Sequence, residues 1–465
     1  MTSFAVRRGE IRKRSDVWFN LPLHRAIEKR IRNSRYRVTT LGDRAIISRL
    51  VDGPFGTQVK VEDYRDNGVP LLRVSNCRDN EVSDDDLVYI SPELHARLLR
   101  SEVLPGDVVL TKTGHILGYA AVFPKRHERA NMTSHLVLMR PTEELSAAYL
   151  AAFLRTSVGQ DQIYRWGQKA TKPELNTIEI RQFLIPVPDR DQQVRLLSRL
   201  DSARAISRQK LEEAGSLLGD LDAFVFNALG LTLSLPRVHR TTYAVRLAQV
   251  SKESKLYPDY FHPERLSMIR EVERKYSKTN CGTLQSLVTF HRDQRRIRPN
   301  DNYLGLANVQ PNTGERVETT EEDGEGAVFE YAKKDVLFGR LRPYLNKVYL
   351  AESDGVCSPE FHVMRVRTGT NGRPRIIPEY LAAILRSTLV LSQTRHMMTG
   401  NTHPRLANDD VVNLVVPVPN EEKQQAIGLE VSRRRDSARR LRAGAAKLWD
   451  DAKFSFEAEL LAPAK

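Results

Sequence analysis

The sequence predicts an α+β protein that contains two tandem-repeated, sheet-rich globules and two long helices. Three observations lead to this fold class: a segment that occurs twice, many short apolar runs within each copy, and two helical runs too long for one globule. The duplicated segment, residues 183–188, reappears as residues 414–419, which moves Pro186 to Pro417. Each copy ends in Pro-x-Pro and is followed by an acidic patch, a Gln-Gln pair and a long helical run. The chain is therefore interpreted as a tandem duplication.

The length of the chain also requires more than one domain. A chain of 465 residues exceeds what a single hydrophobic core normally holds. Placing the boundaries at the two Pro-x-Pro segments predicts four parts, namely a first globule over residues 1–188, a helix over 189–230, a second globule over 231–419 and a helix over 420–462.

The two copies keep the same order of segments. Trp18-Phe19 and Tyr260-Phe261 each precede a charged helical run, and leucine-led segments at Leu41 and Leu284 then open a region of short apolar runs. These runs alternate with Gly, Pro and Asn, which is typical of strands joined by turns. Mixed, sheet-rich globules are expected in both halves.

A second pair of segments combines a buried strand with a basic end. Residues 106–114 and 334–343 each contain a turn with an aspartate, an apolar strand, and then Lys112 or Arg340 where the strand ends. Further along, residues 149–155 and 380–386 are nearly identical and have helical spacing, and residues 171–175 match 402–406. These matches predict a shared scaffold around diverged loops.

The two helical runs carry an apolar stripe. A helix of about forty residues is about 60 Å long, and these are polar on their other faces, so neither can be a core helix of one globule. We expect an uninterrupted first helix, with the two helices packed on each other and on partners. Their apolar residues are spaced three and four apart: Leu211, Ala214, Leu218, Leu221, Val225 and Ala228 in the first helix, and Leu441, Ala445, Leu448 and Ala452 in the second. The alternative is a C-terminal helix that packs only on the surface.

Composition favours a polyanionic partner. The chain has 72 Lys and Arg against 58 Asp and Glu, a formal charge of +14. Nucleic acid is the first candidate, and a merely basic soluble protein is the alternative. The three cysteines form no CxxC and predict buried thiols in a reducing cytoplasm. No long apolar span or signal peptide is present, so no membrane association is expected.

Motifs of catalysis are absent from the sequence. There is no phosphate-binding loop, dinucleotide fingerprint, HExxH, GxSxG or amino-methyltransferase signature. Glu421 and Lys423 superficially resemble a nuclease motif, but acidic residues at a helix N-terminus favour a stabilising role. The histidines at 115, 135, 362 and 403 lack ligand spacing. We predict no catalytic residues and no metal ligands.

Basic and amide side chains beside strand ends are the candidate DNA contacts. Arginine and lysine reach guanine O6 and N7, asparagine and glutamine reach adenine, and other cations neutralise phosphates. The predicted set is Lys60, Arg73, Asn76, Lys112, Gln168, Lys169, Lys172, Arg292, Arg295, Arg296, Asn308, Arg340, Arg342, Asn346 and Lys347.

These motifs together resemble the specificity subunit of type I restriction–modification systems. The resemblance covers nearly the whole chain and rests on an ordered set that occurs in both halves: residues 41–43 leading to Asp-Gly-Pro-Phe-Gly at 52–56, residues 69–76, residues 106–114, residues 335–347, and the Pro-x-Pro segments with their helices. The second half departs from the pattern, because it has Phe-His-Arg-Asp-Gln at 290–294 where the first has Asp-Gly-Pro-Phe-Gly.

The resemblance implies two target-recognition domains joined by an antiparallel coiled coil. Each domain would read one half of a bipartite, asymmetric site in the major groove of double-stranded DNA. The subunit itself would be non-catalytic and bind no cofactor. Two modification subunits would bind S-adenosylmethionine and methylate adenine, and restriction subunits would use ATP and Mg²⁺, in the cytoplasm of a bacterium or archaeon.

Other functions remain as alternatives. The chain can be a stand-alone DNA-binding or nuclease component of another defence system, or a protein-interaction adaptor whose charge serves solubility. A steep salt dependence of DNA affinity separates the DNA-binding functions from the adaptor, because phosphate neutralisation releases counterions.

Overall fold

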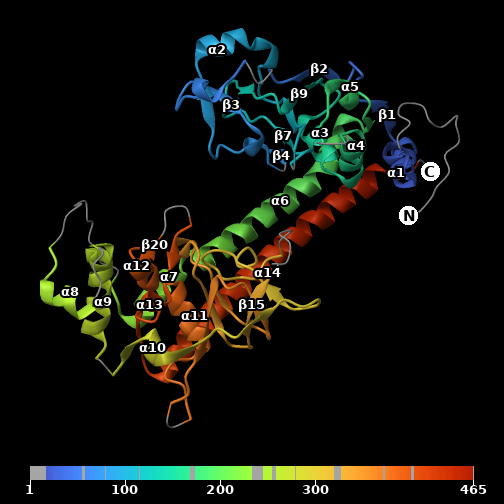
Figure 1. Cartoon of the computed structure of the whole chain (residues 1–465). Coiled ribbons are helices and arrows are strands. Elements are labelled where there is room, and N and C mark those ends of the chain that lie inside the picture. The colour runs from blue at the N-terminus through green and yellow to red at the C-terminus, as the bar shows by residue number, and fades with distance from the viewer. Residues whose placement is uncertain are drawn as a thin grey trace. The chain divides into compact units, whose positions relative to one another are not determined.

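The computed structural model describes residues 17–54, 58–78, 80–114, 116–167, 173–232, 244–253, 258–277, 279–318, 326–369, 372–399 and 403–463. The chain divides into two compact units (Figure 1). Unit 1 comprises residues 1–209 and 444–465, and unit 2 comprises residues 210–443. Each unit contains one sequence copy and a part of both long helices. The unit boundaries therefore lie within the helices, and the four-part division at residues 188, 230 and 419 stays a prediction.

Unit 1 is built on two sheets and a strand pair. The larger sheet has the order β2-β9-β6-β7-β4 (Ile47–Asp52, Leu136–Pro141, Val108–Thr111, Ala120–Val122, Asn80–Glu81). The smaller has the order β5-β3-β8 (Val88–Ile90, Val69–Leu72, Asn131–Met132), and β1 (Arg37–Thr40) pairs with β10 (Leu184–Val187). Its helices are α1 (Pro22–Arg32), α2 (Pro92–Arg97), α3 (Ala147–Leu154), α4 (Ser157–Gly167) and α5 (Thr177–Ile180).

Unit 2 repeats the central part of this plan. Its sheet β12-β19-β16-β17 (Val288–His291, Phe361–Val366, Val336–Gly339, Val348–Leu350) has the strand order of β2-β9-β6-β7. A second sheet has the order β13-β15-β18-β14 (Gln294–Arg296, Ala327–Tyr331, Gly355–Cys357, Tyr303–Leu304). Two pairs are β11-β22 (Cys281–Thr283, Val415–Pro417) and β20-β21 (Met398–Thr399, Arg405–Leu406). Its short helices are α7 (Leu221–Leu229), α8 (Leu247–Glu253), α9 (Pro263–Lys275), α10 (Leu284–Leu287), α11 (Pro378–Arg386), α12 (Thr388–Thr394) and α13 (Asn408–Val411).

Buried side chains make the same contacts in both units, which confirms the duplication. The Tyr149 hydroxyl donates to the Pro186 carbonyl at 2.7 Å, and Tyr380 donates to the Pro417 carbonyl at 3.0 Å. In unit 2 the Gln393 amide donates to the Val415 carbonyl at 2.8 Å and accepts from the Val415 N–H at 3.0 Å. Gln162 makes the same two bonds to Leu184 in unit 1.

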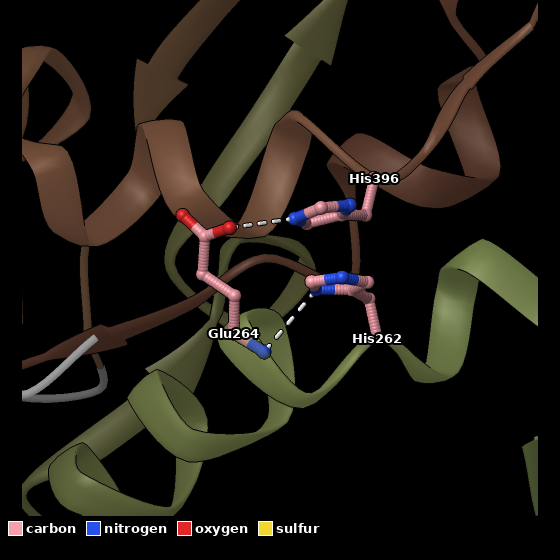
Figure 2. Close-up of side chains that lie close together, drawn as sticks. All are labelled: His262, Glu264 and His396. Atoms are coloured by element: carbon pink, nitrogen blue, oxygen red, sulfur yellow. Dashed lines mark hydrogen bonds and ion pairs between the residues drawn. The ribbon is translucent and has the colours of Figure 1, made fainter. Parts of the chain in front are cut away.

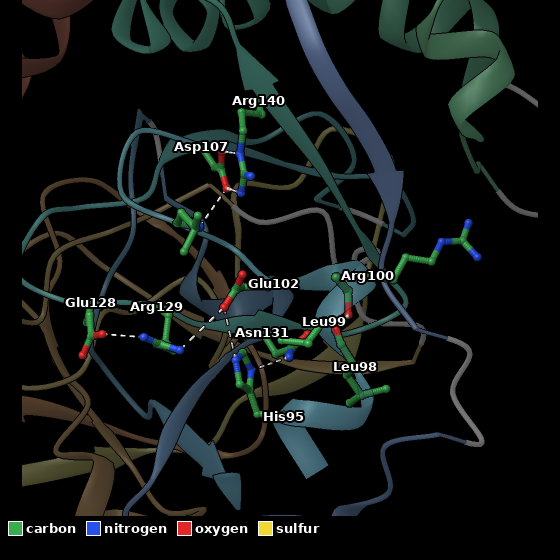
Figure 3. A network of polar contacts seen from close by, with 12 residues as sticks. His95, Leu98, Leu99, Arg100, Glu102, Asp107, Glu128, Arg129, Asn131 and Arg140 are labelled. Carbon is green, nitrogen blue, oxygen red and sulfur yellow. Dashed lines mark hydrogen bonds and ion pairs between the residues drawn. The ribbon is translucent and has the colours of Figure 1, made fainter. Parts of the chain in front are cut away.

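A buried aspartate closes the turn before the central strand of each unit. Asp107 accepts two hydrogen bonds from the Arg140 guanidinium, at 2.7 and 2.8 Å, as Figure 3 shows within a larger polar network of unit 1. Asp335 pairs with Arg365 in the same way. Because a buried carboxylate needs charged or hydrogen-bonded partners, these pairs hold β6 and β16 in register with β9 and β19.

The long helices are α6 (Arg190–Gly219) and α14 (Glu421–Leu460). Within unit 1 they run antiparallel: Arg199 contacts Glu459 at 3.1 Å, and the Ser207 hydroxyl donates to the Ala445 carbonyl at 3.2 Å. Within unit 2, Arg434 of α14 lies over the Phe224 ring of α7. The predicted packing of the two helices on each other is confirmed.

Two details of the predicted helices are wrong. The first helix is interrupted at Asp220, where α6 ends and α7 begins, so it is not one continuous helix. The predicted stripe also fails at Leu211, which is 50 % exposed, whereas its members Ala214 and Ala445 are buried as predicted. Small side chains let two helix backbones approach closely, which leaves larger neighbours at the flanks of the contact. Accordingly Val225 is buried, and the remaining leucines of the stripe are half-buried: Leu218, Leu221, Leu441 and Leu448.

Replacing Gln393 by leucine tests the role of the buried amide. The change removes the partner of the N–H and carbonyl of Val415 beside the fully buried Gln393 side chain, so we expect the free energy of unfolding of unit 2 to fall by about 2–4 kcal/mol. Urea unfolding and hydrogen exchange at the Val415 amide measure the effect. Gln425→Leu, an exposed change on α14, is the control. Equal losses in both variants would contradict the proposed role.

Candidate nucleic-acid interface

The basic residue at the end of the central strand is held by a second repeated segment in each unit. In unit 1 the backbone of Lys112 donates to His135 at 3.0 Å and accepts from Leu175 at 2.9 Å. In unit 2 Arg340 donates to Glu360 at 2.9 Å and accepts from Leu406 at 3.0 Å. We call each arrangement a strand-end platform: residues 112–114 with 173–175 in unit 1, and residues 340–342 with 404–406 in unit 2.

The platforms bring together segments that are distant in sequence. The Gly114 N–H donates to the Pro173 carbonyl at 3.4 Å, and the Arg342 N–H donates to the Pro404 carbonyl at 2.7 Å. Leu175 and Leu406 are fully buried and anchor the second segment of each platform. The two matched segments of each copy thus form one surface. The predicted contacts Gln168, Lys169 and Lys172 directly precede Pro173 and lie outside the described residues.

In unit 1 the predicted basic contacts differ in their exposure and in their internal partners. Lys60 is exposed. The Lys112 ammonium is half-buried and lies 2.8 Å from the Asp52 carboxylate. The Arg73 guanidinium donates to the Asp86 carbonyl. Lys112 and Arg73 therefore support loops of unit 1 as well as contributing positive charge.

In unit 2 three of the predicted cations are exposed, namely Arg292, Arg296 and Arg342. Tyr344, two residues after Arg342, is 49 % exposed and presents an aromatic ring. Arg405 of the platform forms a bidentate contact with Glu360. This contact balances the negative charge of the Glu360 carboxylate, which lies beside Arg340. The sequence interpretation did not include Tyr344 and Arg405, although both lie in segments that it had matched.

Two other predicted cations of unit 2 have internal partners. Arg295 binds Asp301 at 2.7 Å and Glu330 at 2.5 Å, and these carboxylates raise the pKa of its guanidinium. The same contact lowers the pKa of Asp301 to about 2, with a further contribution from the Arg298 N–H. The Lys347 ammonium donates to the Leu306 carbonyl at 2.7 Å. Both side chains brace the loops around the platform.

The three asparagines of the predicted set make internal hydrogen bonds. Asn76 is fully buried, and its amide accepts from the Arg73 N–H and donates to the carbonyls of Ser83 and Asp85. Asn308 accepts from the Gly305 N–H in the matched turn of unit 2.

Asn346 has a left-handed backbone (φ 52°), is 5 % exposed and donates to the Arg386 carbonyl. Asparagine is favoured at such turns because its short side chain can bond the nearby backbone. These asparagines therefore support turns of their own unit, and their contact with DNA stays a prediction.

A small cavity lies beside Arg340. It measures about 230 Å³ and is lined by Phe290, His291, Arg292, Phe329, Arg340, Phe361, His362, Val363 and Asn408. His362 is 4 % exposed, and its Nε2 atom has no hydrogen-bond partner among the described residues. Burial, and secondly the charges of Arg340 and Arg292, lower the pKa of His362 to about 3. The histidine is consequently neutral at physiological pH.

A known protein is similar to part of the chain in sequence. The chain is 21 % identical over 182 residues to the specificity subunit of the type I restriction enzyme EcoBI from Escherichia coli, a match that covers 38 % of this chain and 38 % of that protein. No family model matches the chain. The chain is thus similar in sequence to a type I specificity subunit over about two fifths of the length of each protein.

Solved structures of specificity subunits are similar over most of their length. The S subunit of a type I restriction–modification system from M. genitalium is 11 % identical, covers 93 % of this chain and 97 % of its own, and has a TM-score of 0.45. The HsdS subunit from Thermoanaerobacter tengcongensis is 13 % identical and covers 92 % and 97 %, with a TM-score of 0.37. A chain from a type I R-M system studied for its complex assembly is 13 % identical and covers 91 % and 96 %, with a TM-score of 0.45.

Glu421 and Lys423 lie in the first turn of α14. The Asn420 side chain accepts from the Lys423 N–H at 3.1 Å and so caps the helix. Glu421 is held by Gln425 and lies 3.9 Å from Arg373. The predicted helix-stabilising interpretation of this acidic patch is confirmed.

The cysteines agree with the prediction of buried thiols, with one exception. Cys77, Cys281 and Cys357 are free thiols, and burial raises the pKa of Cys77 and of Cys357 to about 12. Cys281 is half-buried rather than buried. Among the described residues, no helix combines the length and apolar character that a membrane crossing requires.

The buried His362 predicts a pH dependence of stability. Its folded pKa of about 3 lies below the ordinary value of 6.5, so below pH 6.5 the unfolded chain gains a proton that the folded chain does not. Stability is lost as the pH falls from 6.5 toward 3. Between pH 7.5 and pH 5 the free energy of unfolding of the native chain, measured with urea, should fall by about 2 kcal/mol more than that of the His362→Gln variant. The same pH dependence of the free energy of unfolding in both proteins would contradict this prediction. His403→Gln, which changes an exposed histidine, is the control.

Proposed function

We propose that this chain is the sequence-specific DNA-binding subunit of a type I restriction–modification complex. Each unit reads one half of a bipartite, asymmetric site in the major groove, and α6, α7 and α14 join the two readers. The observation that supports this most directly is the strand-end platform, because it recurs in both units with a basic residue at the same backbone position, Lys112 or Arg340.

The platform has the chemistry that base reading requires. A guanidinium can bind guanine O6 and N7 with two parallel hydrogen bonds, and side chains at a rigid strand end lose little freedom when they do so. Arg340 and Arg342 project from a backbone that four hydrogen bonds hold in place. The exposed Tyr344 ring can contact a thymine methyl group or a sugar. Diverged loops around a shared platform allow the two units to read different sequences.

The predicted contacts divide into two groups on this proposal. Side chains that approach bases are Arg292, Arg296, Arg340 and Arg342 of unit 2 and Lys112 of unit 1, with Gln168, Lys169 and Lys172 retained as proposals. Lys60 neutralises a phosphate. Arg73, Arg295 and Lys347 add charge while they support the loops through their internal bonds.

The chain has no catalytic role in this proposal. Two modification subunits carry S-adenosylmethionine and the adenine methyltransferase activity, and restriction subunits carry ATP, Mg²⁺ and the endonuclease activity, in the cytoplasm of a bacterium or archaeon. Exposed apolar side chains on the long helices support partner docking: Val194, Ile206 and Leu211 on α6, and Leu429 and Phe454 on α14.

Mapping of methylated adenines tests this function. The chain is expressed with its modification subunits in a host that lacks other adenine methyltransferases. We expect one asymmetric motif made of two specified halves and an unspecified spacer, and no methylation without the chain. Methylation at a single continuous motif, or methylation that does not depend on the chain, would overturn the proposal.

Charge removal at one platform should affect one half-site. In Arg340→Ala/Arg342→Ala, specificity should relax in the half read by unit 2, and affinity for the mapped site should fall at least tenfold, because each bidentate base contact contributes about 1–3 kcal/mol. Motif mapping and salt-dependent binding of the complex measure the two effects. Arg433→Ala/Arg439→Ala, which removes two exposed charges of α14, is the charge-matched control. Relaxation of both halves would contradict the assignment.

A further inference from the structure

Three side chains of unit 2 with metal-ligating chemistry lie together (Figure 2). His262 is the N-cap residue of α9, Glu264 is in the first turn of that helix, and His396 follows α12. One candidate ligand atom from each residue lies within 4.8 Å of the other two. The sequence interpretation missed this group because His396 is 132 residues from Glu264.

The contacts within the cluster orient its polar atoms. The His396 Nε2 atom lies 2.9 Å from Glu264 Oε2, and the Arg395 guanidinium donates to the other carboxylate oxygen at 3.1 Å. The rings of His262 and His396 are stacked, with centroids 3.7 Å apart and planes 12° from parallel. His262 Nδ1 accepts from the Glu264 N–H at 3.3 Å. In Figure 2 both rings present a nitrogen toward the side on which Glu264 lies.

We propose that His262, Glu264 and His396 bind a divalent transition metal ion of the Zn²⁺ class. Two imidazole nitrogens and one carboxylate oxygen are a common zinc donor set, and water completes the four-coordinate shell. The ion replaces the proton shared between His396 and Glu264. His262 is ready to ligate because burial, and secondly His396, lower the pKa of its imidazole. Arg395 holds the second carboxylate oxygen, as outer hydrogen bonds commonly do at metal sites.

Metal binding requires a small rearrangement. Ligand atoms around tetrahedral zinc are about 3.3 Å apart, so the side chains must move closer, and the stacked rings must turn until both planes point at one ion. All three residues are only partly buried, which leaves room for these rotations. His262 can give up its long capping bond to the Glu264 N–H in exchange for the metal.

The matched position in unit 1 shows that the scaffold forms without these ligands. Matching α9 with α1, and α12 with α4, places Leu21, Leu23 and Arg165 where unit 2 has His262, Glu264 and His396. The helices α1 and α4 nevertheless pack on each other, as α9 and α12 do. The ion therefore acts as a clamp between α9 and α12 that is specific to the second unit, and it does not depend on DNA recognition.

Metal titration of the full chain without a polyhistidine tag tests the proposal. We expect one equivalent of Zn²⁺ to bind in calorimetry, Co²⁺ to give the visible absorption of a tetrahedral site, and saturating Zn²⁺ to raise the melting temperature by on the order of 5 °C. His396→Ala should weaken binding at least tenfold. The triple variant H262L/E264L/H396R carries the residues of unit 1 and should bind no ion at this site.

Two controls make the outcome decisive. His291→Ala removes a histidine outside the cluster and should bind Zn²⁺ as the native chain does. Circular dichroism and melting without metal should show that each variant is folded. If native protein binds no Zn²⁺ or Co²⁺, or if the folded triple variant binds it with unchanged affinity, the proposed site is wrong.

Discussion

Proline in a strand creates the constraint on which each unit depends. Proline has no N–H and cannot complete an ordinary ladder, so the segments around Pro186 and Pro417 need side chains as hydrogen-bond partners. Tyrosine from α3 or α11 and glutamine from α4 or α12 supply them. Gln193 and Gln424 then bond the carbonyls of Pro188 and Pro419 at the start of each long helix. The Pro-x-Pro segment thus ties each globule to its helix.

This constraint explains which parts of the two copies stay alike. The tyrosine, the glutamines and the proline carbonyls form one buried network, and loss of any member leaves a buried polar group without a partner. Loops outside the network carry no such penalty, which allows the sheet β13-β15-β18-β14 of unit 2 to differ from β5-β3-β8 of unit 1. The strand-end platforms lie where the common sheet meets these diverged loops. A recognition surface at this position can change without loss of the scaffold.

Helix pairing relies on small side chains as much as on large ones. Within the predicted stripe Ala214 and Ala445 are buried to 1 % or less, and Ala438, which the stripe did not include, is fully buried. When two helix backbones approach closely, many weak van der Waals contacts form between them. Leu211 then lies at the edge of the helix pair. The break at Asp220 follows two glycines, Gly215 and Gly219, which lower helix propensity near the end of α6. Periodicity located the helices and the buried Ala214 and Ala445, but it also included the exposed Leu211.

The sequence by itself determined the duplication, the order of elements, the position of the basic strand ends and the family resemblance. These follow from local patterns such as Pro-x-Pro, apolar strands and helical spacing, which need no knowledge of distant neighbours. Only the tertiary structure decided that Asn76 and Asn346 are buried supports, that Arg295 is balanced by Asp301 and Glu330, and that His262, Glu264 and His396 share one site. The physical reason is that burial, ion pairing and ligand geometry depend on segments that folding brings together from far apart in the chain.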